Sequence, residues 1–333
     1  MRALHATAAT LLVVLVCPIP ADAAANPCGE SEPIYAVANA DQSVTALTVH
    51  TNTDKVIRRS QPFRYAGFFT TAAVPATSEH IYVHQSDTYG LKRPTFTAVS
   101  LNDDSVSTLR PALILTRPPV VSADGSRAYL RGLDDVRVFT FADGTTKTVL
   151  TLKSISTMAV SPDGTRLYVT TSTSKLVQYL SADGAHVTDV VTGGVPSSPV
   201  VSPDGAFVYV AIGGRSPKIA KYDAKDLRLV AELTVDSFSD NLVPSPDGSR
   251  LFYRDAKSIA VVDTTTMSAA TRFGLIGSFV LSPNGGCLYA IKPVHEGGGV
   301  FRMSSTGEGL RQVDLGPGVR TIAFRWAKAK EGP

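Results

Sequence analysis

Five side chains in this sequence have the chemistry for acid–base work or anion binding: His84, Arg131, Arg254, His295 and Glu296. The first three share a position, because each stands two residues after an aromatic residue in a strand-like segment. Guanidinium groups bind carboxylates and phosphates through paired hydrogen bonds. A histidine near a glutamate suits proton transfer or metal-assisted hydrolysis. These five residues are the predicted catalytic set.

The motifs that mark common catalytic sites do not occur in the sequence. It contains no His-Glu-x-x-His zinc motif, no Gly-x-Ser-x-Gly nucleophile motif and no glycine-rich phosphate loop. Asp-Gly pairs recur without the alternating Asp/Asn ladder and closing Glu of a calcium loop. We therefore predict no cofactor, with a divalent metal held by His84, His295 and Glu296 as the open alternative.

One short pattern recurs along the chain and explains where these residues stand. Its clearest copies read Val-Ser-Pro-Asp-Gly at 160–164 and 201–205, with variants at 121–125, 244–248 and 281–285. Pro fixes φ at the first corner of a tight turn, Asp bonds to the nearby backbone, and Gly takes positive φ. Including two degenerate copies near the N-terminus, the pattern leads to seven aromatic anchors: Tyr35, Tyr82, Tyr129, Tyr168, Tyr209, Phe252 and Tyr289.

The recurrence predicts seven copies of a four-stranded unit. A second hairpin follows each anchor, at 43–57, 95–109, 136–150, 175–191, 218–233, 258–273 and 299–315. Four short strands in about 40 residues form one blade of a β-propeller. We predict an all-β, seven-bladed β-propeller as a single domain over 26–333. The chain enters inside blade one, so the strand-like segment 319–326 is expected to complete that blade and close the ring.

These phrases carry a family resemblance. Ser-Pro-Asp-Gly followed by Tyr-Val, together with 34–39 and 260–264, resembles the YVTN-type propeller repeat over nearly the whole chain after residue 25. The resemblance implies the propeller fold. It leaves activity open, because related propellers include 6-phosphogluconolactonase-like enzymes, secreted and surface-layer repeat proteins, and non-catalytic binding modules.

The N-terminal 1–25 has the three-part pattern of a secretory signal peptide: Arg2, an apolar run over 8–16, and small residues up to Ala25. We therefore expect a secreted or periplasmic protein, without a transmembrane span because no apolar run is long enough. Val16 before Cys17 disfavours a lipid anchor. Cys28 and Cys287 then remain, in neighbouring blades, where a disulfide would staple the ring; two unpaired buried cysteines are the alternative.

Composition narrows the range of partners only slightly. The 333 residues are 44% hydrophobic and 18% charged, which allows a sizeable core. The net charge is +3, and Lys and Arg are scattered rather than clustered, so we predict no nucleic-acid partner. We expect a monomer that binds a protein, a glycan or a small anionic ligand.

The propeller fold predicts where such a partner binds. All Pro-Asp-Gly turns fall on one face, and the opposite face carries loops of variable length, where binding usually resides. We single out five ligand-binding candidates there: Arg64, Tyr89, Phe238, Asp240 and Asn241. The leading hypothesis is a non-catalytic binding module. The alternatives are a lactonase-like hydrolase or lyase in the central channel, with the five catalytic candidates, or a structural envelope-associated protein in which those residues merely line a solvated channel.

Overall fold

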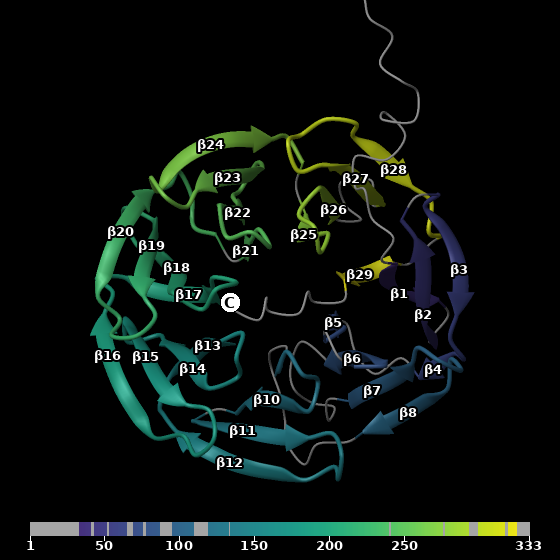
Figure 1. Ribbon diagram of the computed structural model, residues 1–333, viewed down its shortest axis with the longest axis horizontal. Coiled ribbons are helices and arrows are strands. Elements are labelled where there is room, and N and C mark those ends of the chain that lie inside the picture. The colour runs from purple at the N-terminus through teal and green to yellow at the C-terminus, as the bar shows by residue number, and fades with distance from the viewer. Residues whose placement is uncertain are drawn as a thin grey trace, which may run out of the picture.

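Seven antiparallel β-sheets surround a central axis and form a seven-bladed β-propeller, as predicted (Figure 1). The computed structural model describes residues 33–324, except 41–42, 52, 65–68, 76–77, 87–94, 110–118, 133, 240, 276, 293–298 and 317–318. The predicted signal peptide and Cys28 therefore lie outside the described residues. In the part of the chain that is described, no helix is long and apolar enough to cross a membrane.

Each blade has four main strands, which follow one another from the axis outward. Blade one contains β29 (Val319–Phe324), β1 (Ile34–Ala40), β2 (Ser43–His50) and β3 (Lys55–Arg59), and the short β4 (Phe63–Arg64) also pairs with β2. Blade two contains β5 (Phe69–Ala73), β6 (His80–Ser86), β7 (Thr95–Ser100) and β8 (Val106–Leu109). Blade three contains β9 (Val120–Val121), β10 (Arg127–Arg131), β11 (Asp135–Thr140) and β12 (Thr146–Thr151). Blade four contains β13 (Ile155–Val160), β14 (Arg166–Thr171), β15 (Lys175–Leu180) and β16 (His186–Val191). Blade five contains β17 (Val195–Val201), β18 (Phe207–Gly213), β19 (Lys218–Asp223) and β20 (Leu229–Thr234). Blade six contains β21 (Leu242–Pro244), β22 (Arg250–Arg254), β23 (Ile259–Asp263) and β24 (Ser268–Phe273). Blade seven contains β25 (Ser278–Leu281), β26 (Cys287–Ile291), β27 (Val300–Ser304) and β28 (Arg311–Val313).

The recurring turn joins the first and second strands of blades three to seven. In blade four, Asp163 accepts the Thr165 amide, and Gly164 has φ +73° and donates to the Ser161 carbonyl at 2.9 Å. The Ser161 hydroxyl donates to Asp163 and accepts the Arg166 amide at 2.9 Å, a role that was not predicted from the sequence. The buried serine therefore ties both arms of the hairpin to the aspartate, which explains its place in the repeat.

The aromatic anchors stand where the repeat places them. All seven lie in the second strand of their blade and are at most 7% exposed. Their side chains enter the apolar layers between neighbouring blades, which form the core of the ring. Since each of those layers is shared by two blades, the core is continuous around the disc.

Strand β29 closes the ring. It pairs antiparallel with β1, with Tyr35 opposite Ala323 and Ala36 opposite Ile322, and a bulge follows Val37. Figure 1 shows this C-terminal strand beside the N-terminal strand β1. The predicted closure is confirmed over its described residues. The pairing covers the sheet edge that β1 would otherwise expose.

Polar clamps run in one direction across all seven blade interfaces. In each clamp a side chain of one blade donates a hydrogen bond to a backbone carbonyl of the next blade. The seven donor–acceptor pairs, in order around the ring, are Arg58–Leu101, Tyr82–Gly125, Arg131–Ile155, Gln178–Ala224, Lys221–Thr264, Arg250–Ser305 and Arg302–Thr51.

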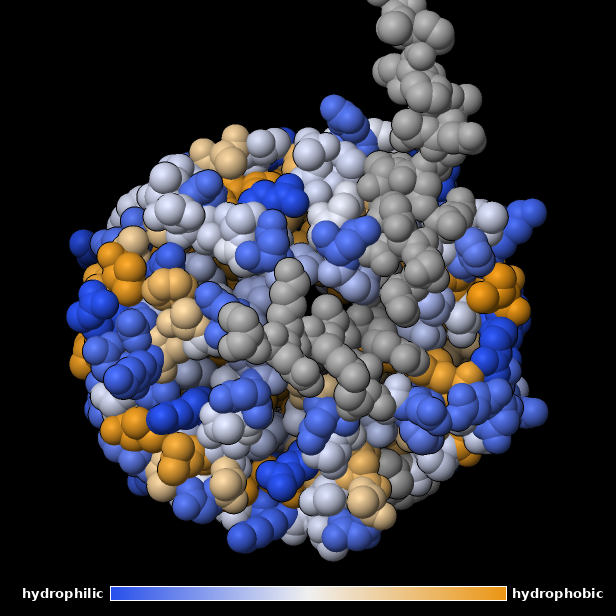
Figure 2. Space-filling view, viewed as in Figure 1, coloured by the Kyte–Doolittle hydropathy of each residue, from blue (hydrophilic) through white to orange (hydrophobic). Residues whose placement is uncertain are grey.

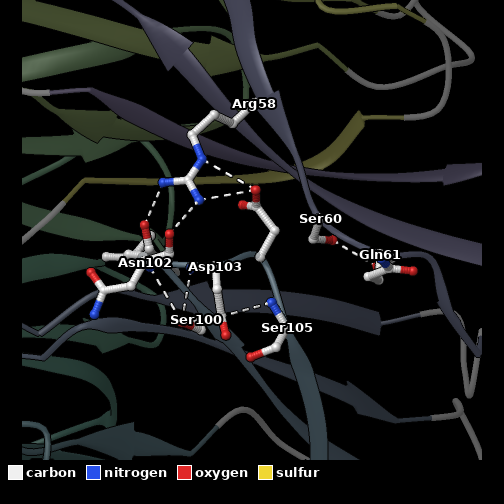
Figure 3. A network of polar contacts seen from close by, with 9 residues as sticks. Arg58, Ser60, Gln61, Ser100, Asn102, Asp103 and Ser105 are labelled. Atoms are coloured by element: carbon white, nitrogen blue, oxygen red, sulfur yellow. Dashed lines mark hydrogen bonds and ion pairs between the residues drawn. The ribbon is translucent and has the colours of Figure 1, made fainter.

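The clamp between blades one and two shows the arrangement (Figure 3). Arg58 on β3 reaches the turn of the outer hairpin of blade two, where it donates to the carbonyls of Leu101 and Asn102. The same guanidinium pairs with Asp104 at 2.9 Å. Arginine suits this role because its fixed fork of donors satisfies several acceptors of one turn at once.

The clamp from blade seven to blade one buries a charged side chain. Arg302 is 2% exposed and donates to the Thr51 carbonyl, to Asp54 Oδ1 at 2.9 Å and to the Tyr289 hydroxyl at 3.4 Å. Burial raises the pKa of Tyr289 to about 12, which keeps that hydroxyl neutral beside the guanidinium. A buried charge of this kind is tolerated because its three hydrogen-bond partners are all acceptors and one of them is a carboxylate.

We predict that Arg302→Met lowers the free energy of unfolding by about 3 kcal/mol, because it removes one partner of a buried ion pair and strands a buried carbonyl. Urea unfolding at pH 7 measures the change. Arg228→Met is the matched control, since Arg228 is an exposed arginine 3.9 Å from Asp223 and its loss costs under about 1 kcal/mol. Equal losses in the two variants would contradict the role given to the clamp.

Candidate functional site

The described members of the predicted catalytic set come from three different blades. His84 is near the end of β6, Arg131 ends β10 and Arg254 ends β22. His84 packs within its own blade, whereas Arg131 reaches into blade four. His295 and Glu296 lie outside the described residues. A joint catalytic role for the five residues stays a prediction.

Arg131 holds two blades together. Its Nη1 donates to the carbonyls of Ile155 at 2.9 Å and Ser156 at 2.7 Å, both on β13, the innermost strand of blade four. Strand β13 bulges between Ile155 and Met158, which turns these two carbonyls toward the same donor. The guanidinium that the sequence suggested for an anion is thus engaged with backbone.

A hydroxyl cluster next to this bulge was not predicted. Thr157 and Thr170 share a hydrogen bond of 2.7 Å between their hydroxyls, and the Ser198 amide donates to Thr157 Oγ1 at 3.0 Å. Ser198 has φ +49° and sits in a second bulge, on β17 of blade five. The hydroxyls therefore join the inner strands of blades four and five. In the sequence, the only sign of this cluster is that small hydroxyl residues interrupt the alternation of apolar residues along the strands.

His84 is a buried, neutral imidazole. It is 2% exposed, packs against Phe96 with ring centroids 5.4 Å apart, and neither ring nitrogen has a hydrogen-bond partner among the described residues. Burial lowers the pKa of His84 from 6.5 to about 4, so the ring carries no charge at neutral pH. The neutral ring offers one hydrogen-bond donor and one acceptor, but it has no charge that would attract an anion. The adjacent Gln85 is also fully buried, with no partner for its amide in the described chain.

The predicted ligand-binding residues fall in two places. Arg64 is exposed on β4, where it pairs in register with Ser43 of blade one. Phe238 and Asn241 lie in the loop that leads from β20 to β21, in front of blade six. Tyr89 and Asp240 are outside the described residues. The structure therefore does not bring Arg64 together with Phe238.

The loop before blade six displays Phe238 on a fixed support. Phe238 is 43% exposed, and its ring lies over Gly213: a Cβ added at Gly213 would be 3.2 Å from Phe238 Cδ2. Ser237 Oγ accepts the Ala256 amide at 3.0 Å, which attaches the loop to the turn between β22 and β23. On the other side, Ser239 Oγ donates to the Asn241 carbonyl, which also accepts the Arg254 amide of β22 at 3.2 Å. An exposed aromatic ring is thus held between two anchored neighbours.

Ion pairs complete this attachment. Arg272 on β24 bridges Asp236 of the loop, at 2.8 Å, and Asp255 of the β22–β23 turn. Burial opposes the ionisation of Asp255. The pKa of Asp255 nevertheless lies below its usual value, because its carboxylate accepts hydrogen bonds from the Lys257 and Ser258 amides and the Ser258 hydroxyl and lies beside Arg272. Asp255 is therefore ionised at neutral pH and keeps the turn in place.

We call the surface formed by Arg215, Asp236, Phe238, Lys257 and Arg272 the Phe238 patch. Arg215 lies in the loop after β18 and Lys257 in the turn after β22, and both are exposed. Figure 2 shows one face of the disc, where hydrophobic residues form separate patches among hydrophilic ones. A lone exposed aromatic ring among cations is a common form of protein-binding surface.

The fold and this patch define a seven-bladed β-propeller with a candidate binding surface on its loops. Its sequence matches no family model and no curated protein. A protein of unknown function from Desulfotomaculum acetoxidans shares the fold with a TM-score of 0.70 and 14% identity, over 89% of this chain and 100% of that one. A candidate 6-phosphogluconolactonase from Bacteroides uniformis has a TM-score of 0.65 and 15% identity, over 89% and 100%. The dihydro-heme d1 dehydrogenase NirN has a TM-score of 0.61 and 14% identity, over 90% and 75%.

These similarities show the fold alone, because fold and activity vary independently at such identities. Within the described residues, no three His, Cys, Asp or Glu side chains are grouped closely enough to hold a metal ion.

We predict that the buried His84 makes stability fall with acidification before the aspartates titrate. The unfolded chain takes up the proton near pH 6.5 and the folded protein only near pH 4, so protonation favours unfolding between these values. The free energy of unfolding should drop by about 2 kcal/mol between pH 7 and pH 4.5 from this residue. Urea unfolding of His84→Phe should lack that drop. An identical pH dependence in wild type and variant would show that His84 is not a buried, neutral side chain.

Proposed function

We propose that this protein is an exported, non-catalytic binding module of the YVTN type that captures a protein partner through the Phe238 patch. The observation that carries the proposal is the exposure of Phe238 on a loop attached on both sides. Aromatic anchors with few rotatable bonds dominate binding energy at many interfaces. A ring that is already held in place loses little conformational entropy when the partner arrives.

Charge suggests what the partner presents. Arg215 and Lys257 are exposed cations of the patch, whereas Arg272 is already paired with both Asp236 and Asp255. The patch therefore has a surplus of positive charge around an apolar centre. A complementary partner would offer an apolar pocket with carboxylates at its rim, which would also steer association.

The geometry of the catalytic candidates favours binding over catalysis. Arg131 is engaged with backbone carbonyls, and His84 is neutral and buried. The second candidate function is a lactonase-type hydrolase, favoured by the His84 nitrogens, which have no partner within the described chain, and by the fold shared with the candidate 6-phosphogluconolactonase. A screen of lactones and esters, with metal analysis of the purified protein, tests it: turnover abolished by His84→Ala would favour the enzyme.

Export through the predicted signal peptide is part of the proposal, and the seam between blades seven and one supports it. Cys287 is fully buried on β26, in the same apolar cluster as Ile34 of β1. Cys28 precedes Ile34 by only a few residues, so the chain can bring the two cysteines together. A disulfide there would require an oxidising compartment.

We predict that Cys28 and Cys287 are paired in protein purified from an exported form. Thiol labelling in denaturant should modify neither cysteine unless a reductant is added first, and mass spectrometry should identify the linked peptide. Reduction should lower the melting temperature, because the bridge links the two ends of the ring. Labelling of both cysteines without reductant would exclude the pairing.

We predict that Phe238→Ala weakens partner capture at least tenfold while the melting temperature is unchanged. The wild-type protein, immobilised, is incubated with secreted and cell-surface proteins of the source organism, and captured proteins are quantified by mass spectrometry. Gly213→Ala should act in the same direction, since its Cβ would displace the Phe238 ring.

Val191→Ala is the matched control, because Val191 is a 68% exposed apolar residue on the outer strand β16 of blade four and is not one of the patch residues. Capture that is equal in Phe238→Ala and Val191→Ala would refute the proposed surface.

A further inference from the structure

A groove lies at the outer rim where the last blade meets the first. It has a volume of about 700 Å³ and is lined from one side by Lys55, Val56 and Arg59 of β3, and from the other by Arg311 and Gln312 of β28. Figure 1 shows β28 beside β3 at this rim. We call it the seam groove. Its volume is in the range of sites for small ligands.

The floor of the seam groove already contains a neutralised carboxylate. Asp54 is 12% exposed at its side chain and accepts Arg302 through Oδ1 at 2.9 Å and Arg311 through Oδ2. Two guanidinium groups thus share one carboxylate, which leaves one positive charge in excess beneath the groove. This excess is hard to screen, because Arg302 is 2% exposed.

The walls add to that excess. Lys55 and Arg59 are exposed, and neither has an ion-pair partner among the described residues. Asp314 is the opposing acid, and one of its oxygens accepts the Gly316 amide at 3.0 Å. Four cationic side chains therefore face two carboxylates, and three of the four cations reach the lining itself. The site is polar, concave and positively charged.

We propose that the seam groove binds an oxyanion, a phosphate or carboxylate group of a small ligand. Lys55 and Arg59 supply charge from blade one, and Arg311 supplies donors that are not used on Asp54 from blade seven. Guanidinium and ammonium groups in the lining of one concave site are suited to bind such groups. This site is separate from the Phe238 patch, and its test does not depend on the proposed function.

Occupancy of the seam groove is coupled to ring closure. The walls come from the first and the last blade, so the site exists only when the two blades are joined. A ligand that binds the closed ring and not the unfolded chain stabilises the ring by an amount that grows with the logarithm of its concentration above the Kd. A bound oxyanion therefore stabilises the interface between blades seven and one, in addition to the Arg302 clamp.

The experiment uses pyrophosphate and citrate as probes on the full chain, at constant ionic strength set with sodium chloride. Calorimetric titration should show saturable binding, and the melting temperature should rise with either probe. Lys55→Gln combined with Arg59→Gln should weaken binding at least tenfold and abolish the rise in melting temperature. Both residues lie outside the Asp54–Arg302 clamp, so the variant should melt like wild type without the probe.

Lys147→Gln on β12 is the matched control, since Lys147 is an exposed cation on the outer strand of another blade. It should bind both probes like wild type, as should Phe238→Ala. A preference for pyrophosphate assigns a phosphate ligand, and a preference for citrate assigns a carboxylate. Absence of saturable binding, or equal weakening by Lys147→Gln, would overturn the proposal.

Discussion

The pairing of β29 with β1 is the contact on which the rest of the structure depends. It supplies the innermost strand of blade one from the far end of the chain, with Ile322 opposite Ala36 and Ala323 opposite Tyr35. Without it, β1 would present an open edge, and the apolar layers on both sides of blade one would lose Ile322 and Ala323. The seventh clamp, from Arg302 to the Thr51 carbonyl, joins blade seven to the same blade.

The directional clamps explain why polar and charged residues occur in the middle of apolar strands. Gln178, Lys221 and Arg302 occupy one position, opposite the aromatic anchor on the third strand, and each donates to the outer turn of the next blade. These donors replace the solvent that carbonyls at the blade interfaces would otherwise need. Polar side chains at these positions therefore fix the position of each blade relative to the next.

The repeat predicted the architecture well because its determinants are local. Pro-Asp-Gly specifies a turn whatever surrounds it, and the missing first strand of blade one left 319–326 as its natural complement. The partners of a long side chain come from parts of the chain that are distant in sequence. For this reason the sequence suggested Arg131 as an anion receptor. Its partners, Ile155 and Ser156, face it only because β13 bulges. His84 likewise looks catalytic in the sequence, but in the fold it is 2% exposed and packs against Phe96 of the neighbouring strand.

The two proposed surfaces lie on different parts of one ring. The Phe238 patch is on loops of blades five and six, and the seam groove is at the rim between blades seven and one. A rigid, closed ring keeps both in fixed positions. Native-state hydrogen exchange of the whole chain tests this closure directly. We expect the amides of β29 and β1 to exchange with the same free energy of opening as the second strands of the other blades. Exchange of β29 well before those strands would contradict the closure.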